Sequence, residues 1–105
     1  MTSVFEISPL ADGMGIRVEG EVDLANAHEL REALANIPVV SEIHLDVAEL
    51  LFIDSSGLRV ILAFAESLNG AGPLVILNPS PAIGRLLEIT AINTHPKVEV
   101  RPASW

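Results

Sequence analysis

The sequence contains no cysteine, which excludes disulfide bonds, thiol catalysis and metal sites built from thiolates. Aromatic residues make up only 4% of the chain and apolar residues as a whole 50%, so the core must be mainly aliphatic. That composition is typical of a β-sheet packed against helices. Long apolar runs are missing too, and Glu6 and Asp12 interrupt the first segment. We therefore expect neither a membrane span nor a signal peptide, and a cytoplasmic location.

Basic residues are scarce as well, because 6 Lys and Arg oppose 14 Asp and Glu and give a formal net charge of −8. Binding to nucleic acid or to an anionic membrane surface needs clustered basic side chains. Here the single lysine, Lys97, and the arginines are scattered along the chain. We expect no nucleic-acid partner and interpret the negative charge as favouring solubility.

The length and the apolar pattern predict a single domain over residues 1–105, since no repeat or linker divides the sequence. Two β-type runs, residues 4–8 and 16–19, flank an Asp-Gly pair and predict a hairpin. Apolar residues at a spacing of three to four predict a helix over residues 25–36, which Pro38 ends. The charged residues of this helix, Glu29, Arg31 and Glu32, are interpreted as its solvent-facing side.

The middle of the sequence combines strand and helix patterns. Residues 42–47 alternate as a strand, and residues 50–53 form a short apolar run that leads into a polar tetrad at 54–57. A helix follows, and its expected buried stripe consists of Leu58, Ile61, Leu62, Ala65 and Leu68. Val60 and Phe64 lie off this stripe, so the helix is apolar on more than one side.

The last third adds two strands and a helix. The continuous apolar run at 74–77 predicts a strand that is covered on both faces. Ser80-Pro81 is typical of a helix start, and residues 98–101 predict a final strand. A hairpin followed by alternating helices and strands indicates an α/β fold, with a mixed sheet of about five strands packed against helices.

The tetrad Asp54-Ser55-Ser56-Gly57 is the most informative segment for function. By local rules alone it is a helix cap, because Asp and Ser satisfy the free N–H groups of a first helical turn. A cap needs neither two adjacent serines nor a glycine, which lowers helix stability. We interpret the glycine as leaving room for another molecule to approach the backbone and the hydroxyls.

The run from 50 to 62, with its DSSGL core, resembles the phosphorylation-site region of bacterial anti-sigma factor antagonists, which are single-domain STAS proteins. Residues 20–23 resemble the family's G-E-x-D turn after the second strand. Residues 45–50 resemble the strand before the phosphorylation loop, and residues 79–87 resemble the helix after the fourth strand. Together these blocks cover most of residues 4–90 in the family's order, which implies a STAS fold.

The resemblance also implies a regulatory role and no enzymatic activity. In this family the unphosphorylated antagonist binds an anti-sigma factor that is also a serine kinase, and thereby releases the sigma factor. Phosphorylation switches this binding off, and a PP2C-type phosphatase restores it. Matched onto this sequence, the phosphoacceptor is Ser55. The implied partner-binding residues are Asp23, Asp54, Ser55, Ser56, Gly57 and Leu58.

A phosphate at Ser55 adds about −1.5 to −2 charge units, which is favourable at a helix N-terminus. We therefore expect phosphorylation to act at the partner interface, through size and through repulsion beside Asp54 and Asp23, and to leave the fold intact.

Two alternatives remain open. The chain could be a constitutive STAS scaffold subunit of a stress-signalling assembly or of a lipid-transport ATPase, although such subunits often lack the phosphoacceptor serine. It could also be a small hydrolase that uses Ser55, but no residue near the loop supplies a base. No cofactor or metal is expected, because the histidines are isolated and the nearest carboxylates read as solvated or capping groups. These residues are His28, His44 and His95, and Asp46, Glu49 and Asp54.

Overall fold

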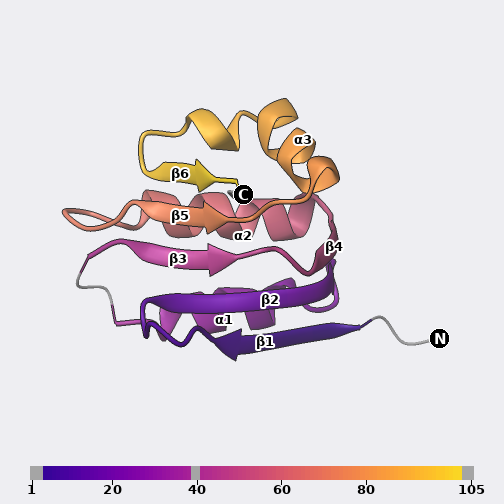
Figure 1. Ribbon diagram of the computed structural model, residues 1–105, viewed down its shortest axis with the longest axis horizontal. Coiled ribbons are helices and arrows are strands. Elements are labelled where there is room, and N and C mark those ends of the chain that lie inside the picture. The colour runs from indigo at the N-terminus through magenta and orange to yellow at the C-terminus, as the bar shows by residue number, and fades with distance from the viewer. Residues whose placement is uncertain (1–3, 39–40, 103–105) are drawn as a thin grey trace.

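The computed structural model describes residues 4–38 and 41–102, which form one β-sheet with helices against it (Figure 1). The strands are β1 (Phe5–Pro9), β2 (Gly15–Val22), β3 (Ile43–Asp46), β4 (Leu50–Ile53), β5 (Leu74–Leu77) and β6 (Val98–Arg101). The helices are α1 (Ala27–Ala35), α2 (Ser55–Glu66) and α3 (Pro81–Ile89), with a short 3₁₀ helix, η1 (Ile92–Thr94), before β6. The predicted α/β class and the order of elements are confirmed.

The sheet is mixed, with strand order β1-β2-β3-β5-β6, and β4 also pairs with β2. Strands β1 and β2 form the predicted antiparallel hairpin, whereas all other pairs are parallel. The sheet thus has six strands, one more than the central estimate from the sequence. The additional strand is β4, which the sequence suggested only as an apolar run leading into the polar tetrad.

Strand β2 is longer than predicted, because its two halves pair with different strands. Its first half pairs with β3 and its second half with β4, with a register shift between Gly20 and Glu21. The G-E-x-D block is therefore not a turn. Its first three residues continue β2, and only Asp23 lies beyond the strand.

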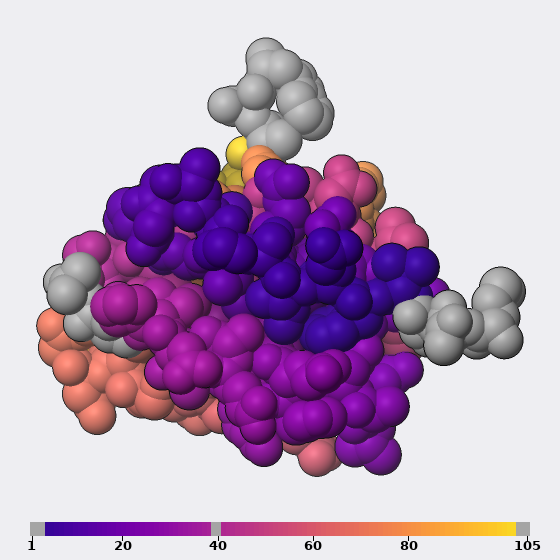
Figure 2. Space-filling view, turned by 90° about the horizontal axis from the view of Figure 1, so that it is seen from below, coloured from indigo at the N-terminus to yellow at the C-terminus, as the bar shows by residue number. Residues whose placement is uncertain are grey.

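Helices α1 and α2 lie side by side behind the sheet, and α3 lies near β6 (Figure 1). Leu30 and Leu34 of α1 are fully buried. Of the stripe predicted for α2, Leu62 is only half-buried, and the other members are buried: Leu58, Ile61, Ala65 and Leu68. The face in Figure 2 is formed largely by the hairpin and α1, the segments coloured indigo to purple. No helix in the described part of the chain is long and apolar enough to cross a membrane.

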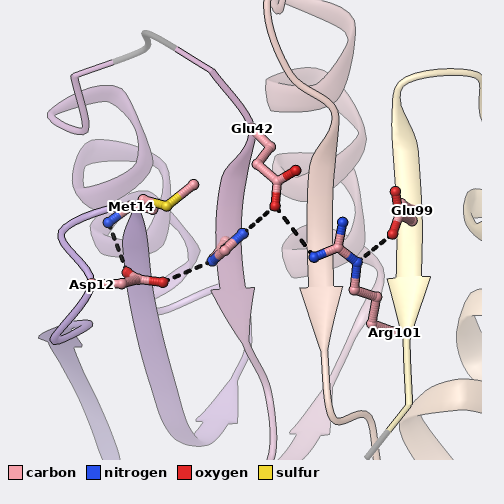
Figure 3. Close-up of polar contacts among 6 residues, drawn as sticks. Asp12, Met14, Glu42, Glu99 and Arg101 are labelled. Carbon is pink, nitrogen blue, oxygen red and sulfur yellow. Dashed lines mark hydrogen bonds and ion pairs between the residues drawn. The ribbon is translucent and has the colours of Figure 1, made fainter.

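The face of the sheet opposite the helices carries a row of polar side chains. His44 lies between two carboxylates, with Nδ1 3.0 Å from Asp12 and Nε2 2.5 Å from Glu42. Arg101 continues the row, because it bonds both Glu42, at 3.3 Å, and Glu99 (Figure 3). The row joins the hairpin loop to β3 and β6.

Strand β5 shows what this polar layer does. Its residue Val75 is completely buried, yet alternation places it on the face opposite its neighbours Leu74 and Ile76. The prediction that β5 is covered on both faces is thus confirmed by its burial. On the flanking strands, the register partners of Val75 are His44 and Glu99, two members of the polar row.

Candidate functional site

The candidate site lies where β2 and β4 end side by side. Val22 is the register partner of Ile53, and the amide of Asp54 donates a hydrogen bond to the carbonyl of Val22 at 3.1 Å. Because the two strands are parallel, their carboxyl ends lie at the same edge of the sheet. Asp23 and Asp54 are therefore adjacent, as the resemblance implied.

Asp54 is the N-cap of α2. Its Oδ1 accepts hydrogen bonds from the amides of Ser56, at 2.9 Å, and Gly57, at 3.3 Å, and from the Ser56 hydroxyl. The Ser56 hydroxyl is the main cause that lowers the pKa of Asp54, and the amides of Gly57, Ser56 and Leu24 lower it further. The loop therefore presents an ionised carboxylate at neutral pH.

The two serines of the tetrad occupy different environments. Ser55 is the first residue of α2 and its side chain is exposed. Its hydroxyl makes no hydrogen bond within residues 4–38 and 41–102. The Ser56 hydroxyl is half-buried and donates to Asp54. Only Ser55 thus offers a hydroxyl that is both accessible and uncommitted.

Gly57 has a different role from the one that the sequence suggested. A Cβ at this position would lie 2.6 Å from Ile53 Cγ1 and 2.7 Å from Val22 Cγ1. The space beside the glycine is thus filled by the protein's own strands, and the interpretation that it admits another molecule is wrong. Leu58 is also buried, with 8% of its surface exposed. Of the six implied partner-binding residues, Gly57 and Leu58 are thus the two that are buried.

Asp23 forms the turn that starts α1. Its Oδ1 accepts from the amide of Ala25 at 2.9 Å, and its own amide donates to Asn26 Oδ1 at 2.9 Å. Asn26 in turn donates to the carbonyl of Glu21 at 2.9 Å. The sequence analysis missed the bracing by Asn26, although the spacing Asp-x-x-Asn before a helix is a signal for such a turn.

Three exposed apolar side chains lie close in sequence to this loop. Leu24 is 81% exposed, and Leu51 and Phe52 of β4 are 72% and 48% exposed. They are three of the five large apolar side chains that are exposed in the described residues, and all lie within three positions of Asp23 or Asp54. Because Leu51 and Phe52 are successive residues of β4, they lie on opposite faces of that strand, and each exposes apolar surface that a partner protein could cover.

The weaker candidates of the sequence have structural roles. Asp46 is 5% exposed and accepts from Arg17 Nη2 at 3.1 Å and from the amide of Ala48 at 2.9 Å. The carboxylates considered for Mg²⁺ are thus engaged separately, Asp46 by Arg17 and Asp54 by the helix cap. Across the described ranges, no three acidic or histidine side chains come together as a metal site.

A hydrolase arrangement finds no support in the loop. The Ser56 hydroxyl donates directly to a carboxylate, and neither serine is hydrogen-bonded to a histidine in the part that the structure describes. His44 is held by Asp12 and Glu42, on the polar face of the sheet.

Comparisons with known proteins agree with this geometry. The STAS domain profile matches residues 6–103, so the chain belongs to the STAS domain family. It is similar to proteins named anti-sigma-B factor antagonist. The one from Staphylococcus epidermidis is 34% identical over 82 residues, which cover 73% of this chain and 74% of the relative. The one from Staphylococcus aureus strain NCTC 8325 is 32% identical over 80 residues, with the same coverage.

Two solved structures share the fold. An anti-sigma factor antagonist from Mycobacterium paratuberculosis superimposes with a TM-score of 0.78 at 22% identity, over 97% of this chain and 87% of that one. The anti-sigma factor antagonist SpoIIAA in its unphosphorylated form superimposes with a TM-score of 0.65 at 22% identity, over 96% and 90%. The predicted family and STAS-type fold are confirmed.

Proposed function

We propose that this protein is an anti-sigma factor antagonist controlled by phosphorylation of Ser55. In its unphosphorylated form it binds an anti-sigma factor that is also a serine kinase, and so releases the sigma factor. The names of the curated relatives support the antagonist role. The observation that carries the switch is the exposed Ser55 hydroxyl at the start of α2, beside Asp54 and Asp23.

The hydrogen bonds of the loop favour Ser55 over Ser56 as the phosphoacceptor. Phosphorylation of Ser56 would remove the hydroxyl that donates to Asp54 and would place a dianion against that carboxylate. Ser55 can accept a phosphate without loss of any cap bond. The phosphate would also lie at the N-terminus of α2, where the helix dipole stabilises negative charge.

The phosphate then acts on the partner rather than on the fold. Asp54 and Asp23 already make this edge of the sheet acidic, and Leu24 gives it an apolar contact. A dianion in the middle adds bulk and charge that a partner fitted to the neutral serine cannot accommodate. A PP2C-type phosphatase would restore the binding form, and the exchange would take place in the cytoplasm.

The test is phosphorylation by purified anti-sigma factor kinases of the source organism, taken one at a time with ATP. Intact mass is recorded for the wild type, Ser55→Ala and Ser56→Ala. We expect one added phosphate in the wild type and in Ser56→Ala, and none in Ser55→Ala. Calorimetry should show that the unphosphorylated protein binds the kinase and that the phosphorylated one does not.

Three other results would contradict the proposal. Stable binding with no phosphate transfer would support the constitutive scaffold, and co-purification with an ATPase subunit would point the same way. A phosphate retained in Ser55→Ala would move the acceptor elsewhere. The hydrolase alternative has its own test, which is labelling by a fluorophosphonate probe. We expect the probe to leave Ser55 unlabelled.

A further inference from the structure

An apolar groove of about 590 Å³ runs between α1 and α2, on the side of α2 that its buried stripe does not use. The residues that line it include Ala27 of α1 and Val60, Ala63 and Phe64 of α2. Val60 and Phe64 are the residues that the sequence placed off the buried stripe, and both are only half-buried. The second apolar side of α2 therefore faces a groove that nothing in the described chain fills.

The charged residues of the groove are all basic. Arg31 of α1 and Arg59 of α2 line it, together with His28. None of the 14 acidic residues of the chain lines it, although the net charge is −8. Neither arginine takes part in an ion pair within the described ranges. A basic, apolar groove on an acidic protein selects an occupant that is apolar and negatively charged.

The groove is continuous with the candidate partner surface. Leu24 and Ser56 line its end, and these residues neighbour Asp23 and Ser55. A half-open groove between two packed helices suits a third helix that inserts an apolar ridge along it. We infer that the groove binds an amphipathic helix of the anti-sigma factor, with Asp or Glu side chains flanking its apolar ridge. This inference rests on the proposed function and adds where, and with what chemistry, the partner binds.

Arg59 links the groove to the phosphorylation site. Ser55 and Arg59 are four residues apart on α2, a spacing at which side chains of a helix are neighbours. A phosphate on Ser55 competes for the guanidinium that a partner carboxylate would bind. The groove thus loses part of its positive charge when the phosphate is added.

The experiment measures calorimetric affinity for the anti-sigma factor that binds the wild type. The test variants are Arg59→Glu and Ala63→Glu, both at exposed positions of α2. Their matched controls on α3 are Arg85→Glu and Ala82→Glu, which are exposed and lie outside the groove. We expect each groove variant to weaken binding about tenfold or more, and each control by less than about twofold. Circular dichroism and thermal unfolding verify that all four variants fold.

The salt dependence gives a second readout. Affinity of the wild type should fall as ionic strength rises, and the dependence should be weaker in Arg31→Gln/Arg59→Gln, because two basic groups are removed. If the wild type binds the anti-sigma factor and the groove variants bind it as tightly as the control variants, the groove site is overturned and the proposed function stands. No binding of the wild type to any anti-sigma factor overturns both.

Discussion

The main-chain amide of Asp54 donates a hydrogen bond to the carbonyl oxygen of Val22 at 3.1 Å. This bond joins residues 32 positions apart and closes the end of the β2–β4 pair. It aligns the turn that starts α1 with the cap that starts α2. The proposed phosphoacceptor and Asp23 share a surface because of this register.

We predict that Gly57→Ala destabilises the protein, although alanine is the better helix former. The added methyl would overlap Ile53 and Val22, and overpacking of this kind costs about 1–3 kcal/mol. The free energy of unfolding from urea titration measures it. Gly84→Ala is the control, because nothing lies within 4 Å of a Cβ there. It should be neutral or stabilising by up to about 1 kcal/mol. Equal effects at both glycines would contradict the packing role of Gly57.

We predict that His44 contributes stability that is lost as pH rises above its unfolded pKa, because its folded pKa is raised. The hydrogen bond to Glu42 is the main cause that raises the pKa of His44, and Asp12 raises it further. The stabilisation by protonated His44 is complete below its unfolded pKa of about 6.5, and is lost as pH passes the higher folded pKa.

Urea unfolding of His44→Gln at several pH values tests this. The difference in unfolding free energy between the wild type and the variant should shrink as pH rises. A His44→Gln profile parallel to the wild type would sink the prediction.

We predict that Asp54 contributes to stability with the opposite pH dependence. Hydrogen bonds from Ser56 and from main-chain amides lower the pKa of this carboxyl group. Its contribution is therefore present above its unfolded pKa of about 3.9, and is lost as pH falls through the lower folded value. Asp54→Ala should lower the urea midpoint of unfolding at pH 7. The difference in midpoint between the variant and the wild type should become smaller in acid. A difference in midpoint that stays constant until the Asp54 carboxyl is fully protonated would argue against an ionised cap.

We predict that removal of Arg17 destabilises the protein, because the buried carboxylate of Asp46 loses its charged partner. Asp46 is buried and accepts two hydrogen bonds from this guanidinium, at 3.1 and 3.3 Å. Arg17→Ala should destabilise the protein by about 1–3 kcal/mol, since a buried charged acceptor loses its partner. Arg31→Ala, at an exposed position, should stay within about 0.5 kcal/mol of the wild type. A double-mutant cycle with Asp46→Ala isolates the coupling free energy between the two side chains. A coupling free energy of zero would contradict the prediction.

We predict that phosphorylation of Ser55 leaves the protein folded and slightly stabilises α2. The dianion interacts favourably with the helix dipole and with Arg59 one turn away, and such pairs contribute about 0.3–0.5 kcal/mol. Thermal unfolding should show no loss of stability on phosphorylation of the wild type. The gain should be smaller in Arg59→Gln, and circular dichroism should be unchanged in both. Unfolding on phosphorylation would contradict a switch that acts at the interface.

Features that depend on neighbouring residues were predictable. The Ser80 hydroxyl accepts from the amide of Ile83 at 3.2 Å, and the helix starts at Pro81 as expected. Asp54 caps α2 in the same way, so the start of that helix follows from the tetrad alone. The hairpin follows from Asp-Gly between two β-type runs. Each of these rests on hydrogen bonds within a few positions along the chain.

Features that depend on long-range pairing were missed. Strand β4 exists because β2 is long enough to pair with two strands in succession, which its own four residues do not reveal. His44 appeared isolated, yet the hairpin loop brings Asp12 to it from 32 positions away. Arg31 is exposed like Glu29 and Glu32, as predicted, but only the packing of α2 against α1 shows that it also lines the groove.

The sequence by itself determined the α/β class, the order of the elements, the caps of α2 and α3 and, through its DSSGL block with three other matched blocks, the family. These depend on local hydrogen bonds and on the period of apolar residues, both of which are written in adjacent positions. Only the tertiary structure decided that Gly57 serves the core and that Ser55 rather than Ser56 is uncommitted. It alone produced a basic groove on an acidic protein. These properties arise where strands and helices distant in sequence meet, and their contacts are set by packing rather than by any local pattern.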